Sequence, residues 1–357
     1  MIDLSLLPDG GMAWLDASGP RSDVVLSTRI RLARNLQGQA FSQRARDDDR
    51  LAVLERVEDA AREIPILGDA VQFRLDRLER TDRQLLHERH LVSKELAGLE
   101  RDGRPRPGAA LLVTSGAGVM VNEEDHLRLQ SMRSGFALEE AYSEIEALDV
   151  ELGRLLPFAF HREFGYLTSC PTNAGTGLRA SVLIHLPGLV LTKEIGKVLQ
   201  GLAQVGLTFR GLYGEGSEVV GNFFQLSNQT TLGKSETELL EHLAKIVGQV
   251  IEYEEQAREL LLQKAPNEVA DKVWRAFGLL KHARSVTFEE TMNLLSGVWL
   301  GAGLNLIPDV RVYTLNKLLI FTQPAHLASL EGRPTSDPEL ATIRATYVRR
   351  LLAAEAS

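Results

Sequence analysis

The pattern of hydrophobic and polar positions changes about two-thirds of the way along the chain. Up to about residue 235, short apolar runs typical of strands alternate with amphipathic helical stretches. Beyond it, long charged helices dominate, apart from a short strand expected near 310–313. The other predicted elements are strands at 24–34, 110–114, 119–121, 181–186, 207–212 and 223–227, and helices at 47–63, 136–153, 193–204 and 235–262.

This change predicts two domains. Helical periodicity runs through 235–262 and is broken at Pro266, so the boundary is expected within 255–265. We therefore predict a mixed α and β domain at 1–258 and a mostly helical domain at 259–357. A chain of 357 residues is long enough for two separate cores.

Composition excludes several classes of function. A net charge of −8 and a pI near 5.6 disfavour binding to nucleic acid or to anionic lipid. The uncharged stretch 293–307 is too short to span a bilayer and predicts a buried helix and turn. The N-terminus lacks the basic region of a signal peptide, and one cysteine allows no intrachain disulfide. These features agree with a cytoplasmic protein.

The single cysteine, Cys170, opens the run CPTNAGTGLRA at 170–180. A lone cysteine is most often a small buried hydrophobe, but these neighbours favour a loop and an accessible thiol. The glycines at 175 and 177 also fit the spelling of a dinucleotide-binding motif, which Pro171 and the lack of a repeating βα pattern argue against. A phosphate-binding loop ending at 233–235 fails because Asn228 replaces its first glycine.

Charged groups are concentrated in three other places. Arg29 and Arg31 lie two residues apart on a predicted strand, so they share one face and repel each other unless an anion lies between them. The run 123–125, of sequence EED, directly follows a strand and would, if it stood alone, be read as a solvated turn. Glu215 lies in a loop with a glycine on each side, which lets a ligand approach closely.

Arginines adjoin each of these loops, and on an acidic protein such a set is best explained by phosphate. Two loop carboxylates and a thiolate would suit a cationic acceptor, for which a guanidinium is the natural candidate.

Four blocks of sequence resemble the phosphagen (guanidino) kinases. They are STRIRLAR at 27–34, VNEEDHLR at 121–128, the Cys170 loop through Arg179, and RGLYGE at 210–215, and they occur in the family order. The chain looks most like the bacterial protein arginine kinases, because the first block begins at residue 27 and leaves no room for the N-terminal helical domain of the metabolite kinases. The resemblance implies an α+β fold, an antiparallel β-sheet flanked by helices, followed by a mostly helical C-terminal domain.

The resemblance also implies roles for individual residues. The acceptor guanidinium would be held by Glu124, Glu215 and the thiol of Cys170. His90 would lie against the adenine of ATP, and Mg²⁺ would be held chiefly by phosphates and water, with Glu123 or Asp125 in its second shell at most. The nucleotide phosphates would be bound by Arg29, Arg31, Arg128, Arg179 and Arg210.

Partners are implied only by the resemblance. They are protein substrates with accessible arginines, a zinc-containing activator protein, an AAA+ unfoldase-protease and a second copy of the chain in a homodimer, in a stress response that marks proteins for degradation. The family's C-terminal phosphoarginine motif, RDxxRA, is reduced here to LATIRA at 340–345, so phosphoarginine sensing is not expected. Two alternatives stay open: a kinase of a small free guanidino metabolite, and a catalytically silent quality-control adaptor.

Overall fold

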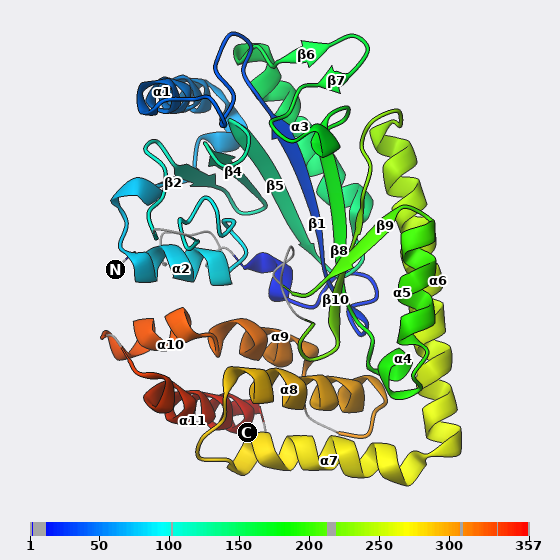
Figure 1. Cartoon of the computed structure of the whole chain (residues 1–357). Coiled ribbons are helices and arrows are strands. Elements are labelled where there is room, and N and C mark those ends of the chain that lie inside the picture. Colours follow the sequence, from blue (N-terminus) through cyan, green and yellow to red (C-terminus); the bar gives the residue numbers. More distant parts are fainter. Residues whose placement is uncertain are drawn as a thin grey trace.

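A computed structural model describes residues 2, 12–100, 103–212, 219–307, 310–333 and 335–355. A β-sheet with its covering helices forms the larger part, and a group of C-terminal helices packs against one end of it (Figure 1). The expected α+β class is confirmed, as is the mostly helical C-terminal region.

The sheet is antiparallel throughout its described strands. Its centre is β1, which pairs with β5 on one side and with β8 on the other. Within the described residues, the main sheet contains eight strands, in the spatial order β2 (Val71–Arg74), β3 (Ala110–Val113), β4 (Ala117–Val121), β5 (Leu127–Ser134), β1 (Val25–Arg34), β8 (Leu178–His185), β10 (Phe223–Asn228) and β9 (Leu207–Arg210).

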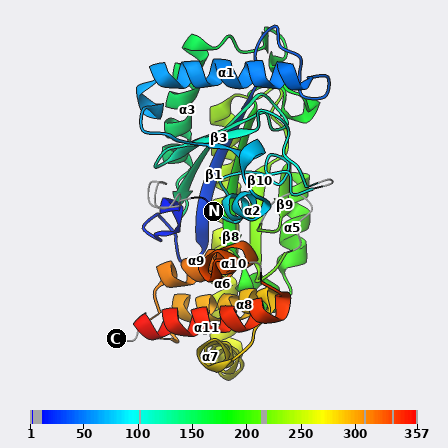
Figure 2. The ribbon, with the colours of Figure 1, turned by 90° about the vertical axis from the view of Figure 1, so that its left-hand side faces the viewer.

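One face of the sheet is apolar and covered by helices. Alternate residues of β1, among them Ile30 and Leu32, point into this core because side chains along a strand alternate between faces. Helix α3 buries a stripe at helical spacing from Leu138 to Leu152 against the same core. Figure 2 shows α1 and the C-terminal helices at opposite ends of the molecule. The covering helices are α1 (Asp47–Glu63), α3 (Leu138–Leu155), α4 (Pro187–Leu191), α5 (Ile195–Gln204) and α6 (Glu236–Lys264).

The opposite face is covered only in part. At the β2–β3 edge a small core forms beneath α2 (Arg80–Glu88), and it contains Leu86 and Leu111. At the end of β8 and β10, Leu183 and Phe223 pack against Trp299 of the C-terminal helices. Between these two apolar regions the face is polar, and Arg29 and Arg31 of the first sequence block lie there.

The C-terminal part is built from α-helices that share one core. Helix α6 runs unbroken across the predicted division at 258 and 259, so that division falls inside a helix and stays a prediction. No helix in the described ranges is long and apolar enough to cross a membrane. The helices that follow α6 are α7 (Pro266–His282), α8 (Phe288–Gly303), α9 (Val312–Phe321), α10 (Pro324–Glu331) and α11 (Asp337–Glu355).

One predicted element is wrong, and one central strand was not predicted. The strand expected at 310–313 is wrong, because α9 begins at Val312 and buries Leu315, Leu318 and Leu319 at helical spacing. Strand β5 was not predicted, although its Leu127 and Leu129 alternate with polar positions. The acidic run before β5 and the arginines within β5 made this segment look like a polar loop, although it forms a central strand of the sheet.

Two short two-residue strands form a separate hairpin. They are β6 (Phe160–His161) and β7 (Gly165–Tyr166), and β7 also bridges to Gly175 of the Cys170 loop.

Candidate active site

The five predicted phosphate-binding arginines lie on one face of the sheet. Arg31 pairs directly with Arg179 of β8, and residues paired across antiparallel strands share a face. The same register carries that face through β5, where Ala33 pairs with Arg128, and to β9, where Gln225 pairs with Arg210. The structure therefore brings together residues more than 180 positions apart in the sequence.

This face concentrates positive charge beyond what its described neighbours balance. Burial, and then the charges of Arg179 and Arg128, lower the pKa of Arg29 to about 10. Burial and the neighbouring arginines also lower the pKa of Arg31 well below its usual value, against a small opposing effect of Glu123. Among the described residues neither Arg29 nor Arg31 has an ion pair, and the Nε atom of Arg31 is buried without a hydrogen-bond partner there. Such a surface fits a polyanion.

Arg34, at the end of β1, faces the other way. Its guanidinium forms a bidentate pair with Asp149 of α3, at 2.9 and 2.8 Å, and stacks on the ring of Tyr166. It also donates to the carbonyls of Ala33 and Thr176. Alternation along the strand thus separates this structural arginine from Arg29 and Arg31.

Arg128 joins the arginine face to the acidic loop. Its Nη1 atom lies 2.6 Å from Glu123 Oε1, and its Nη2 atom lies 3.1 Å from Glu124 Oε2. The two glutamates raise the pKa of Arg128 against the opposing effect of burial, so its charge is fixed. In this arrangement Arg128 holds Glu124 beside the face to which a phosphate would bind.

The acidic loop is mostly buried, and it is not a solvated turn. Asp125 is fully buried and accepts hydrogen bonds from Asn35 Nδ2 and from the backbone N–H of Ser169, both at 2.6 Å. Glu123 is also buried and paired with Arg128, whereas the side chain of Glu124 is 43% exposed. Of the three carboxylates in this run, Glu124 is therefore the one placed to meet a substrate.

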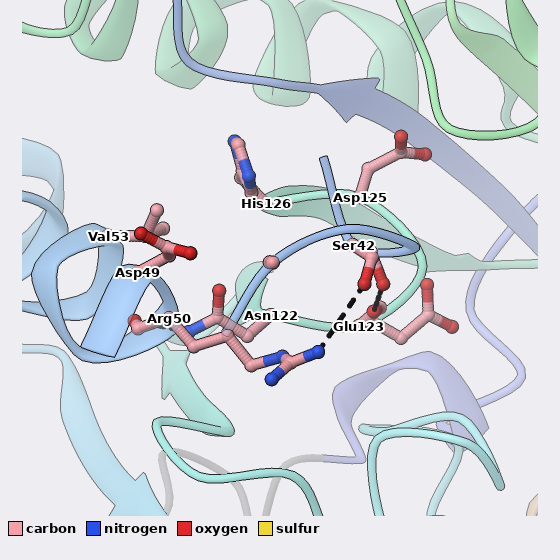
Figure 3. Close-up of a pocket in the computed structure, with 9 residues that line it drawn as sticks. Ser42, Asp49, Arg50, Val53, Asn122, Glu123, Asp125 and His126 are labelled. Carbon is pink, nitrogen blue, oxygen red and sulfur yellow. Dashed lines mark hydrogen bonds between the residues drawn. The ribbon is translucent and has the colours of Figure 1, made fainter. Parts of the chain in front are cut away.

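A small hollow lies behind this loop, between it and the first turns of α1 (Figure 3). The hydroxyl of Ser42 donates to the carbonyl of Glu123, to which Arg106 also donates at 2.9 Å. Asn122, which has a positive φ of 61°, donates to the carbonyls of Arg50 and Gly108. These contacts fix the backbone of the loop from the side opposite the site.

Cys170 lies on a loop that reaches Glu124. Its Sγ atom is 3.0 Å from Thr172 Oγ1, in the short 3-10 turn Pro171–Asn173. The Asn173 side chain donates to Glu124 Oε2 at 3.4 Å. The predicted thiol and the predicted carboxylate thus come from adjoining loops.

Glycines close the Cys170 loop onto the sheet. Gly175 has a φ of 106°, and a Cβ atom there would lie 2.6 Å from the carbonyl oxygen of Thr231. The Thr231 hydroxyl in turn donates to the carbonyls of Thr172 and Ala174. The glycines of this loop therefore serve close packing of its backbone.

The environment of Glu124 suits a proton acceptor. Burial raises its pKa, the charges of Glu123 and Asp125 raise it further, and Arg128 opposes the rise. A carboxylate of raised pKa takes up a proton more readily at neutral pH than an ordinary one.

His90 lies at the end of the arginine face, directly after α2. It has a φ of 60°, its carbonyl accepts from Gln130 Nε2 at 2.8 Å, and its ring contacts the ring of Trp14 edge-on at 5.5 Å. These two rings, Arg29, Met132 and Leu212 line a small hollow that opens to solvent. Its lining combines these rings and apolar side chains with the polar Ser27, Ser181 and Gln225. Such a hollow next to a cationic face suits a flat heterocycle joined to phosphates.

Sequence reasoning missed several residues of this site. Trp14 lies on a short 3-10 helix, Ala13–Leu15, far from any recognised block. Gln130, Ser181 and Ser227 share the arginine face, and Ser227 accepts from Arg179 at 3.2 Å. Regular alternation along β5 and β8 could have indicated Gln130 and Ser181. Glu215 falls at 213–218, outside the described residues.

The comparisons with known proteins agree with this geometry. The family described as ATP:guanido phosphotransferase, C-terminal catalytic domain, matches residues 52–257, more than half of the chain. The chain belongs to this family. A second family, the protein-arginine kinase McsB C-terminal domain, matches residues 266–357.

Full-length relatives carry the name protein-arginine kinase. One from Symbiobacterium thermophilum is 44% identical over 344 residues, which is 96% of either chain. Another, from Bacillus subtilis, is 41% identical over 348 residues, 97% of this chain and 94% of the relative. The chain is therefore placed among the protein-arginine kinases and is a phosphotransferase.

Solved structures show the same fold. A duplicated taurocyamine kinase from Schistosoma mansoni, with bound components of a transition-state analogue, is 30% identical with a TM-score of 0.60. The match covers 71% of this chain and 35% of that enzyme. A lombricine kinase, 23% identical with a TM-score of 0.58, matches 74% of this chain and 72% of its own, and supports the fold alone.

Proposed function

We propose that this phosphotransferase moves the γ-phosphoryl group of Mg-ATP onto arginine residues of proteins. The observation that carries the proposal is the junction of two chemically different half-sites. Arg128 belongs to the arginine face and is ion-paired with Glu124 of the acidic loop, which also contacts the Cys170 loop. A phosphate donor on one side would therefore lie next to a guanidinium acceptor on the other.

The nucleotide half would consist of the arginine face and the His90 hollow. Arg29, Arg31, Arg179 and Arg210 would bind phosphate oxygens, with Arg128 at the transferring group. No group of three or more acidic, histidine or cysteine side chains in the described ranges is arranged to bind a metal ion. Glu123 and Asp125 already accept protein hydrogen bonds. Mg²⁺, which neutralises phosphate charge, would therefore be held by the phosphates and water.

The acceptor half would consist of Glu124, Glu215 and Cys170. As a guanidinium nitrogen attacks the γ-phosphorus, the P–N bond forms, the bond to the bridging oxygen breaks, and ADP leaves. The displaced proton passes to a carboxylate, and Glu124 suits this role because its pKa is raised. Fixed arginine charges stabilise the transferring group without reorganising, and this is how such sites lower the barrier.

The names of the relatives favour protein-bound arginine over free arginine. By the same likeness, we propose that phosphorylation marks proteins for degradation in a cytoplasmic stress response. The activator protein, the unfoldase-protease and the homodimer belong to this proposal.

We also propose that phosphoarginine does not regulate this chain through its C-terminal motif. Arg344, which the motif keeps, is buried and donates to the carbonyls of Thr322 and Val286, at 2.7 and 3.1 Å. These contacts support a structural role. Micromolar binding of phosphoarginine that is lost in Arg344→Lys would contradict it.

The test is to incubate the protein with Mg-ATP and an unfolded, arginine-rich protein, and to map acid-labile phosphate by mass spectrometry. We expect phosphate on arginine, with turnover lowered by roughly 10²- to 10⁴-fold in Glu124→Gln and in Glu215→Gln. Glu163→Gln, on the exposed β6–β7 turn, is the control and should keep full activity.

Each other outcome refutes a definite part of the proposal. Transfer to free arginine alone would make the chain a kinase of a small guanidino metabolite. No transfer, even with an added activator, would favour the silent adaptor. Wild-type rates in both glutamate variants would refute the assignment of the acceptor carboxylates.

A further inference from the structure

The end of α2 is attached to the C-terminal helices by a buried polar link. Glu88 Oε1 accepts from the backbone N–H of Ala325 at 3.0 Å. Its Oε2 atom accepts from the backbone N–H of His326 at 3.1 Å and from the His326 ring at 2.9 Å. Glu88 is thus an acceptor for the first turn of α10, supplied by the other domain.

The link continues to the next residue of α2. Arg89 Nε donates to His326 Nε2 at 3.2 Å, so His326 donates from Nδ1 and accepts at Nε2. This pattern requires the neutral imidazole in a single tautomer. Glu88, Arg89 and His326 are each at least 95% buried, and α2 and α10 lie next to each other in both views (Figures 1 and 2).

His90 follows this link directly in the chain and is held from both sides. On one side its carbonyl accepts from Gln130, the residue opposite Arg31 in the sheet. On the other side, Glu88 and Arg89 are fixed by His326 of the C-terminal domain. The left-handed backbone at His90 is uncommon for a non-glycine residue, so contacts on both sides must maintain it.

We propose that Glu88 and His326 are positioning residues through which the C-terminal domain sets the shape of the base-binding hollow at His90 and Trp14. This inference rests on the proposed nucleotide site. It gives the C-terminal domain a direct part in nucleotide affinity and in selection of the base. Loss of the hydrogen bonds from His326 would release Glu88 and Arg89, and the ring of His90 could then move away from Trp14.

The experiment compares His326→Ala with Ser296→Ala in the full chain. Ser296 is a matched control, because it forms another buried hydrogen bond between the domains, to His185 at 2.8 Å, at the last residue of β8. Binding of Mg-ATP and Mg-ITP is measured by calorimetry, which needs no phosphoryl transfer, and KM and kcat are measured separately. Thermal unfolding shows that each variant is folded.

We expect His326→Ala to weaken Mg-ATP binding by roughly 10-fold, which is within the usual range of coupling between sites. The preference for ATP over ITP should fall, KM for ATP should rise, and kcat at saturating ATP should stay within about 2-fold of wild type. His326→Asn keeps a donor for Glu88 and should recover most of the affinity. Ser296→Ala should bind both nucleotides like the wild type.

Wild-type affinity in a folded His326→Ala, an equal loss in Ser296→Ala, or no recovery in a folded His326→Asn would each overturn the proposal. A wild-type protein that binds Mg-ATP but never phosphorylates arginine would refute the proposed function and leave this inference intact. A wild-type protein that binds no adenine nucleotide would refute both.

Discussion

Arg29 offers a test of the arginine face that separates stability from function. Burial and two neighbouring arginines lower its pKa to about 10, whereas an unfolded arginine keeps a value well above that. Each tenfold change in proton affinity is worth about 1.4 kcal/mol, so keeping this charge costs the folded protein about 3 kcal/mol. Because the folded-state pKa is the lower one, the cost is present at every pH below about 10.

Arg29→Met removes the charge and keeps most of the apolar stem. Part of the stability gained by removing the charge is lost through imperfect repacking, so we expect the free energy of unfolding without nucleotide to rise by about 1 to 2 kcal/mol. For a chain of this size the melting temperature should rise by about 2 °C or more. The same substitution should abolish most of the stabilisation that saturating Mg-ATP gives to the wild type, which is about 2.7 kcal/mol at 100 times Kd.

The assay is thermal or urea unfolding, with and without Mg-ATP. The control is Arg133→Met, because Arg133 lies on β5 but on the opposite face, half-exposed and paired with Glu144. This control should gain no stability and should keep its response to ATP. A less stable Arg29→Met, or one that ATP stabilises as much as the wild type, would refute the reasoning that the arginines repel each other to bind phosphate.

Three further predictions follow from the site and its support. Because the pKa of Glu124 is raised, the transfer rate should begin to fall on acidification at a higher pH than it would with an ordinary glutamate. In pH–rate profiles, Glu124→Gln should lack this acidic limb, and the control Glu163→Gln should keep it. Asp149→Ala should lower the free energy of unfolding by about 3 to 5 kcal/mol, because it leaves the 2%-exposed Arg34 without its ion-pair partner. An unchanged midpoint in urea titrations would contradict this prediction. Gly177→Ala would place a Cβ atom 2.6 Å from the carbonyl oxygen of Ala33, at a residue whose φ is 66°. The transfer rate should drop at least tenfold and the melting temperature should fall, whereas full activity would show that the Cys170 loop tolerates displacement.

The sequence by itself determined the local chemistry and most local structure. Alternation along 24–34 was enough to place Arg29 and Arg31 on one face, and helical periodicity was enough to predict α1, α3 and α6. The polar, glycine-containing surroundings of Cys170 correctly indicated a loop with a partly accessible thiol. Such features depend on neighbours in the chain, so they can be read from short windows.

The tertiary structure alone decided which charges face the site. Asp125 lies within the same acidic run as Glu124, yet it turns inward, because Asn35 and Ser169 offer buried partners from distant segments. Sheet register, and not local pattern, brings Arg179 beside β1 and places Arg210 on the same face of the sheet. The link from Glu88 to His326 joins positions 238 residues apart. No short window of sequence contains such pairings, because strand order, register and domain packing are set by burial over the whole chain.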